Sequence, residues 1–131
     1  MKVLALDYGA ARTGVAVSDE TGTVARPLAV VERASTPEGL RRLAELVREQ
    51  DVELVVVGLP LTLRGEHGLQ ARETDAFVDA LRGSVDVPVE TYDERFTTAI
   101  AARASGVAPE DARAAAHLLH SYLEWKRARR T

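Results

Sequence analysis

Three acidic side chains stand at the ends of regular segments in this chain of 131 residues. Asp7 closes the apolar run LALD, Glu94 directly follows VPVETYD, and Asp111 opens the helical pattern DARAAAHLLHSYLEW. Carboxylates supply only oxygen ligands, which suit the hard cations Mg²⁺ and Mn²⁺ better than zinc. Two such ions, about 4 Å apart, can activate a water and stabilise the leaving oxygen of a phosphodiester. The acids therefore predict a metal-dependent hydrolytic site, with Asp93 open as an alternative to Glu94.

The helical pattern after Asp111 bears on its role. On a helical wheel one face carries Asp111, Ala115, Leu118 and Tyr122, and the opposite face carries Arg113, His117, His120 and Glu124. Asp111 therefore belongs to the face expected to pack on a sheet, where a lone ionised carboxylate is costly without a cation or hydrogen bonds. The alternative role is a first-turn acid that interacts with the helix dipole. The histidines fall on the polar face, and we assign them no role.

A mixed sheet is expected to position these acids. Strands are predicted at residues 2–7, 13–18, 24–31, 53–60 and 87–93, and helices at 37–50, 69–82, near 97–105 and at 109–128. The order βββαβαβαα predicts an α/β fold whose five strands lie in the order 3-2-1-4-5, with helices on both faces. Winding reverses beside the first strand, and ligands bind at the carboxyl ends of strands at such a switch point. Asp7 lies at that end.

Composition limits the classes of protein that the chain can represent. The sequence is 46% hydrophobic, which suits a single domain spanning residues 1–131. It has no cysteine, which excludes disulfides, thiolate nucleophiles and zinc–cysteine sites. No apolar run approaches the ~20 residues of a membrane span, and no signal peptide is evident. We therefore expect a cytoplasmic protein.

The formal charge of −3 is unevenly distributed along the chain. The last residues contribute four positive charges, from Lys126, Arg127, Arg129 and Arg130, so residues 1–125 carry −7, with 13 basic and 20 acidic residues. An acidic body can bind nucleic acid if divalent metals neutralise its acidic cluster and arginines contact phosphate. The basic end is interpreted as a solvated helix terminus that complements the macrodipole.

Four motifs in this order resemble the YqgF/RuvX family of the RNase H-like superfamily: LALDYGAARTGVAVSD, VVVGLPLTLRGEHG, YDERFTT and DARAAAHLLHSYLE. The resemblance runs from residue 3 to about residue 124. The family comprises proteins similar to Holliday junction resolvases and nucleases assigned to pre-16S rRNA. The resemblance implies an RNase H-like fold, a bacterial cytoplasmic nuclease with Mg²⁺ or Mn²⁺, and Asp7, Glu94 and Asp111 as its acidic triad. It favours Glu94 over Asp93, and it implies backbone-shaping roles for Gly9, Gly14, Gly58 and Pro60.

Arginines near these motifs are candidate substrate contacts. Arg12 follows Asp7 in the first turn, Arg64 lies in the segment TLRGEHG, and Arg95 follows Glu94. A planar guanidinium suits phosphate, and at Arg95 it also suits orientation of the acids. His67 is a weaker candidate for a general base, because a metal-activated water needs no histidine.

Several functions are compatible with these residues. The resemblance implies processing of the 5′ end of pre-16S rRNA in ribosome biogenesis, or resolution of branched DNA. A non-catalytic nucleic-acid-binding module is a second class, although such a module could lose its costly acids. The opening motif also resembles the phosphate-binding hairpin of actin-like and sugar-kinase ATPases, which close two such domains around a nucleotide. We expect a monomer or weak homodimer, and leave open RNA or DNA, endo- or exonuclease, and Mg²⁺ or Mn²⁺.

Overall fold

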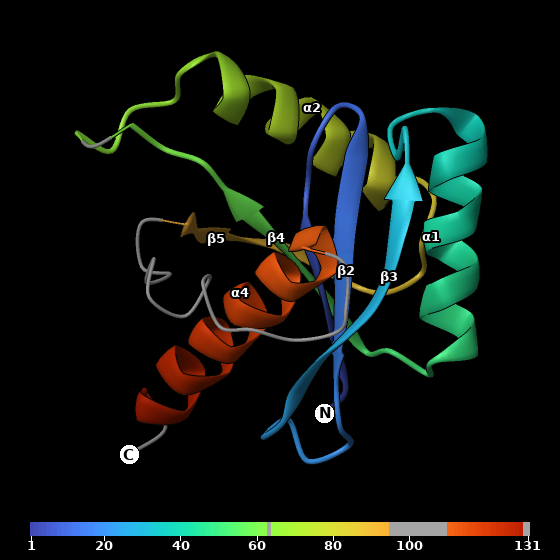
Figure 1. Cartoon of the computed structure of the whole chain (residues 1–131), viewed down its shortest axis with the longest axis vertical. Coiled ribbons are helices and arrows are strands. Elements are labelled where there is room, and N and C mark those ends of the chain that lie inside the picture. The colour runs from blue at the N-terminus through green and yellow to red at the C-terminus, as the bar shows by residue number, and fades with distance from the viewer. Residues whose placement is uncertain (63, 95–109, 130–131) are drawn as a thin grey trace.

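A five-stranded mixed sheet forms the centre of the computed structural model, which describes residues 1–62, 64–94 and 110–129 (Figure 1). The strands are β1 (Val3–Asp7), β2 (Arg12–Ser18), β3 (Ala25–Glu32), β4 (Leu54–Leu59) and β5 (Val89–Asp93). They lie in the order β3-β2-β1-β4-β5. Strand β2 pairs antiparallel with β1 and β3, whereas β4 pairs parallel with β1 and β5. The predicted α/β architecture and strand order are confirmed.

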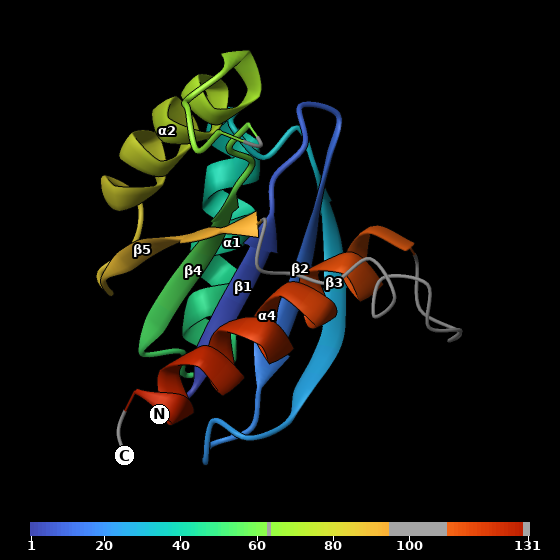
Figure 2. The same ribbon diagram turned by 90° about the vertical axis from the view of Figure 1, so that its left-hand side faces the viewer.

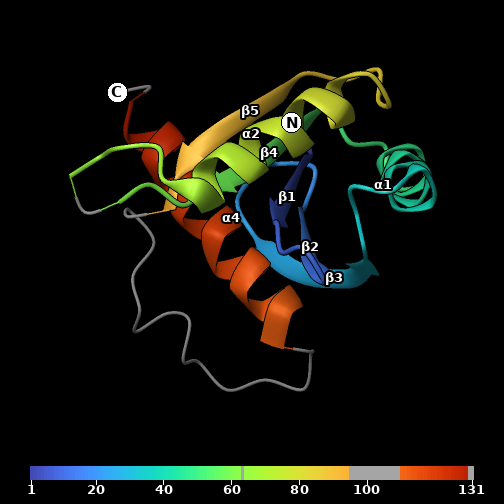
Figure 3. The same cartoon turned by 90° about the horizontal axis from the view of Figure 1, so that it is seen from above.

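Helices cover both faces of this sheet (Figures 2 and 3). Helices α1 (Pro37–Glu49) and α2 (Leu69–Arg82) lie on one face, and α4 (Glu110–Ala128) lies on the other. The helix expected near residues 97–105 lies outside the described residues. Within the part of the chain that the structure describes, no helix has the length and apolar content needed to cross a membrane.

The alternation of side chains along the strands divides the core between the two faces. In β1, Leu4 and Leu6 pack in the cluster under α1 and α2, whereas Ala5 packs in the cluster under α4. In β4, Val55 and Val57 belong to the first cluster, while Leu54 and Val56 belong to the second. The continuous apolar run of β4 therefore reflects burial on both faces.

Local sequence signals explain where the helices begin and which faces they bury. Thr36 is the N-cap of α1, where its Oγ1 accepts a hydrogen bond of 3.1 Å from the Gly39 N–H, and Pro37 occupies the first helical position. In α2 the predicted stripe is buried: Thr74, Phe77, Val78 and Leu81. These stripes place both helices on the same face of the sheet.

Candidate active site

Asp7 and Glu94 meet at one edge of the sheet. Asp7 is the last residue of β1, and Glu94 directly follows β5, with β4 between the two strands. Because β1, β4 and β5 are parallel, their carboxyl ends lie at a common edge. The Glu94 carboxyl hydrogen-bonds to the Asp7 carboxylate. The structure thus brings together two of the three predicted acids.

Burial and mutual repulsion shift both of these acids. Burial raises the pKa of Asp7, the hydrogen bond from Glu94 lowers it, and the negative charge of Asp111 raises it, with a net upward shift. Burial also raises the pKa of Glu94 to about 7, and the charge of Asp7, their hydrogen bond and the charge of Asp93 add to the rise. The carboxyl pair therefore retains a proton that ordinary surface carboxylates release.

Asp111 approaches this pair from the other side, at the start of α4. Its Oδ2 lies 3.3 Å from Nε of Arg12, and its side chain is 40% exposed. The wheel prediction is confirmed further along the helix, where Ala115, Leu118 and Tyr122 are buried. Asp111 itself is more exposed than expected, because it occupies the first turn, where α4 reaches the edge of the sheet.

Gly14 allows the first turn of α4 to approach β2. It is the partner of Asp7 in the β1–β2 ladder. A Cβ at Gly14 would overlap the carbonyl group of Asp111 and would lie 3.1 Å from the backbone N of Ala112. The missing side chain thus permits backbone contact between strand and helix, and this contact places Asp111 beside the strand that pairs with Asp7.

Two further glycines and a proline shape the same edge. A Cβ at Gly58 in β4 would lie 2.6 Å from Glu94 Oε1, so the glycine leaves room for that carboxyl between β1 and β5. A Cβ at Gly9 would lie 2.5 Å from the carbonyl O of Arg12, so the turn after Asp7 is tight. Pro60 lines the cleft described next.

A cleft of about 320 Å³ opens over Asp7 and Glu94. Its lining consists of Asp7, Tyr8, Gly9, Ala10, Pro60, Gln70, Glu73, Thr74 and Glu94. Sequence reasoning did not assign Gln70 and Glu73 to the site. Their signal is positional, since they precede Thr74 by four and one residues on α2, on the face that is buried further along the helix. The Tyr8 ring stacks on Phe77, with centroids 4.3 Å apart, and thereby ties α2 to the catalytic edge.

The other predicted contacts are distributed around this cleft. Arg12 is 65% exposed and pairs with Asp111, whereas Arg64 is exposed in the loop between β4 and α2 and does not line the cleft. Arg95 lies outside the described residues. His67 Nδ1 lies 3.0 Å from Asp75 Oδ2 at the surface, so its ring is oriented toward α2.

The donor set fits a hard divalent cation. Among residues 1–62, 64–94 and 110–129, no three His, Cys, Asp or Glu side chains are arranged as a complete metal site. The partly buried Asp7–Glu94 pair nevertheless offers oxygen ligands alone, and the proton that it retains marks negative charge that a cation would neutralise. Asp111, whose charge already acts on Asp7, is the nearest candidate for a third ligand.

Comparison with known proteins agrees with this geometry. The family model RuvX, described as Holliday junction resolvase, matches residues 1–125. A protein of Chloroflexus aggregans named "Putative pre-16S rRNA nuclease" is 42% identical over 95% of this chain and 94% of its own length. A protein of the same name from Rubrobacter xylanophilus is 47% identical over 94% of this chain and 92% of its own. Thermus thermophilus RuvC in complex with a Holliday junction superposes with a TM-score of 0.69, at 19% identity over 98% and 96% of the two chains.

Proposed function

The chain belongs to the RuvX family, and from this membership and the site geometry we propose that it is a divalent-metal-dependent nuclease that hydrolyses phosphodiester bonds of nucleic acid. The substrate that we propose is the 5′ end of pre-16S rRNA, after the name of its relatives. The observation that carries the proposal is the partly buried Asp7–Glu94 pair in an open cleft.

Asp7, Glu94 and Asp111 would hold the metal. Divalent cations bound there would supply the charge that activates a water and stabilises the leaving oxygen. Asp7 and Glu94 lose their shared proton when a cation replaces it, so both carboxylates become ligands. The strands and Gly58 keep the two carboxyls together before the metal arrives, so little reorganisation is needed.

Arg12 would link substrate binding to the acidic site. Its guanidinium now pairs with Asp111 at 3.3 Å. When Asp111 turns to a cation, Arg12 becomes free to contact a phosphate of the substrate, which its planar donors suit. Arg64 and Arg95 are proposed as further phosphate contacts on the two sides of the cleft.

A cleavage assay tests the nuclease proposal. Labelled structured RNA, single-stranded DNA and a four-way DNA junction would be incubated with Mg²⁺, Mn²⁺ or EDTA. Asp7→Asn should lower kcat by at least about 100-fold, because it removes a metal ligand worth several kcal/mol in the transition state. Asp79→Asn is the matched control, since Asp79 is an exposed carboxylate on α2. Cleavage that survives both Asp7→Asn and EDTA would refute the mechanism.

Resolution of four-way junctions is the second candidate function, because the matching family model is described as a Holliday junction resolvase. A resolvase needs two active sites placed symmetrically on its substrate, and hence a dimer. Preferential cleavage of the four-way junction by a dimer would favour this candidate. Cleavage of RNA by a monomer would favour rRNA processing.

A further inference from the structure

The last turns of α4 carry an exposed aromatic ring among cations. Trp125 is 41% exposed, whereas most large apolar side chains of the described residues are buried. The Arg129 guanidinium lies 5.0 Å from the centre of the Trp125 ring, and Lys126 and Arg127 follow Trp125 directly. We refer to Trp125, Lys126, Arg127 and Arg129 as the C-terminal patch.

The positive charge of the C-terminal patch is largely uncompensated by nearby acids. Within the described residues, neither Arg127 nor Arg129 has a carboxylate partner. Glu124, on the same turns, lies 3.1 Å from His120 Nε2 instead. Lys126 Nζ donates to the Tyr122 hydroxyl at 3.3 Å, which in turn donates to Glu90. The two arginines therefore remain available to an anionic partner.

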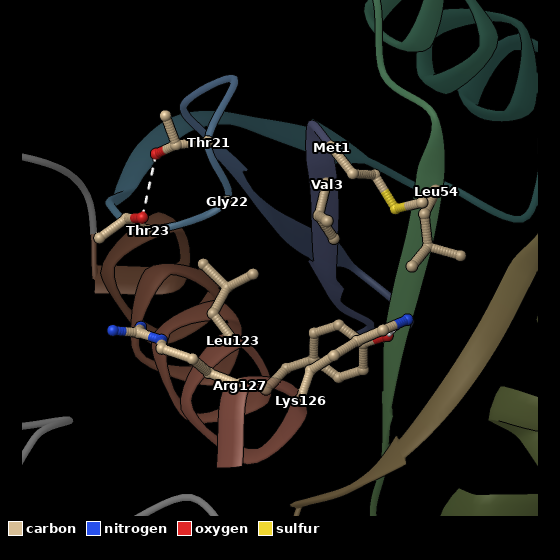
Figure 4. Close-up of a pocket in the computed structure, with 10 residues that line it drawn as sticks. Met1, Val3, Thr21, Gly22, Thr23, Leu54, Leu123, Lys126 and Arg127 are labelled. Carbon is tan, nitrogen blue, oxygen red and sulfur yellow. Dashed lines mark hydrogen bonds between the residues drawn. The ribbon is translucent and has the colours of Figure 1, made fainter. Parts of the chain in front are cut away.

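The patch lies at the edge of the sheet opposite to Asp7. Lys126 and Arg127 line a pocket of about 110 Å³ together with Val3 and Leu54, the first residues of β1 and β4. Figure 4 shows Lys126 and Arg127 extending to opposite sides of the helix, with Arg127 directed toward the turn that holds Thr23. At 1.5 Å per residue, Arg127 lies about 24 Å along α4 from Asp111.

The patch also adjoins the strand that ends at the catalytic edge. The Trp125 ring packs against Tyr92, with centroids 5.7 Å apart. Tyr92 belongs to β5, which ends one residue before Glu94. A strand of nucleic acid that leaves the acidic site along β5 would therefore reach Trp125 first and the cations next.

We propose that the C-terminal patch is a second contact for single-stranded nucleic acid, in which an unpaired base stacks on Trp125 and flanking phosphates pair with Lys126, Arg127 and Arg129. This inference rests on the proposed function, because it assigns the same substrate a second anchoring point. Aromatic rings interleaved with cations bind single strands by stacking and charge neutralisation. Bases within a duplex are already stacked and cannot reach an exposed indole.

Charge makes a second copy of the chain a poorer occupant. A symmetric dimer through this surface would place the cations of one patch against the cations of the other. Nucleic acid instead brings one negative charge with each phosphate. Because the patch lies far from the reacting atoms, it would bind ground state and transition state equally and act on KM rather than on kcat.

Binding measurements without metal separate this contact from catalysis. Fluorescence anisotropy would follow oligouridylate and oligothymidylate of about 20 nucleotides in EDTA, long enough to span about 24 Å at 3.4 Å per nucleotide. Trp125→Ala should weaken binding by at least about fivefold, and Trp125→Phe should retain most of the affinity. Arg127→Gln/Arg129→Gln should reduce the salt slope by about 1.4, since each lost contact with a single strand removes about 0.7. The charge-matched control is Arg41→Gln/Arg48→Gln, on exposed positions of α1 across the sheet.

Each result decides one of the two proposals. Equal effects of the α1 control and the patch variants would overturn the patch, as would unchanged binding by Trp125→Ala. Loss of a dimer in Trp125→Ala, read by sedimentation, would assign the surface to a second copy and also overturn it. If wild type binds with the expected pattern but cleaves nothing, the proposed function fails and the patch stands. In an active enzyme, the patch variants should raise KM while kcat is unchanged, and an effect confined to kcat would refute the patch.

Discussion

Replacement of Gly14 by alanine tests how α4 is seated on the sheet. The new methyl would overlap the carbonyl group of Asp111, so the first turn of α4 would have to withdraw from β2 by more than about 1 Å. Overpacking of this kind costs about 1–3 kcal/mol, and the upper end applies because both groups in contact belong to the backbone. For a domain of this size, about 3 kcal/mol corresponds to a decrease in Tm of about 10 °C.

The same displacement should impair catalysis in the folded protein. Withdrawal of the helix carries Asp111 away from Asp7, and a misplacement of about 1 Å in a catalytic constellation can reduce activity about 100-fold. The assay combines thermal unfolding with kcat/KM for Mg²⁺-dependent cleavage, measured well below the Tm of the variant. Gly83→Ala is the matched control, because a Cβ there would lie 3.5 Å from the Ala80 carbonyl O, an ordinary contact.

Two results would refute this reasoning. If Gly14→Ala and Gly83→Ala unfold at the same temperature, the close approach of α4 to β2 is wrong. If Gly14→Ala is destabilised but retains the kcat/KM of wild type, the position of Asp111 does not matter for cleavage. Asp111 would then lose its proposed role as a metal ligand.

Three further perturbations have outcomes that follow from the site. Gly58→Ala should lower kcat at least about tenfold with a loss of stability below about 1.5 kcal/mol, because its methyl meets the movable Glu94 carboxyl and the Leu118 side chain rather than backbone; kinetics and urea denaturation on one preparation check this. In EDTA, the folded state keeps the Glu94 proton up to pH about 7 while the unfolded state releases it near 4.5, so stability should fall as pH rises through that window, and Glu94→Gln should flatten the fall in urea titrations. A wild-type slope equal to that of Glu94→Gln would contradict the assignment. Arg12→Gln should raise KM and reduce the salt dependence of substrate binding by roughly one phosphate contact, and an unchanged salt slope would show that Arg12 serves only Asp111.

Periodicity explains why the fold could be predicted from the sequence. The run around Val55 and Val57 is apolar at every position, which indicates a strand buried on both faces, and Phe77 and Leu81 recur at helical spacing. Short connections and right-handed crossovers then leave few strand orders. The observed order β3-β2-β1-β4-β5 is the predicted one. The expected helix near residues 97–105 stays a prediction.

The acids of the site could be predicted in part for the same reason. Asp7 and Glu94 follow parallel strands, and parallel strands end at one edge of a sheet, so their proximity follows from topology. The position of Asp111 is different, because it depends on the path that α4 takes across the far face. Its exposure and its pairing with Arg12 have no periodic signal in the sequence.

The sequence by itself determined the elements, their order and the edge at which Asp7 lies, because apolar periodicity and chain connectivity are local properties. Only the tertiary structure decided which surfaces meet. It placed Gln70 and Glu73 in the cleft, seated α4 against Gly14, and left Trp125 exposed beside Tyr92. These contacts depend on packing between segments far apart in the chain, at distances of a few ångströms, and no pattern within one segment encodes them.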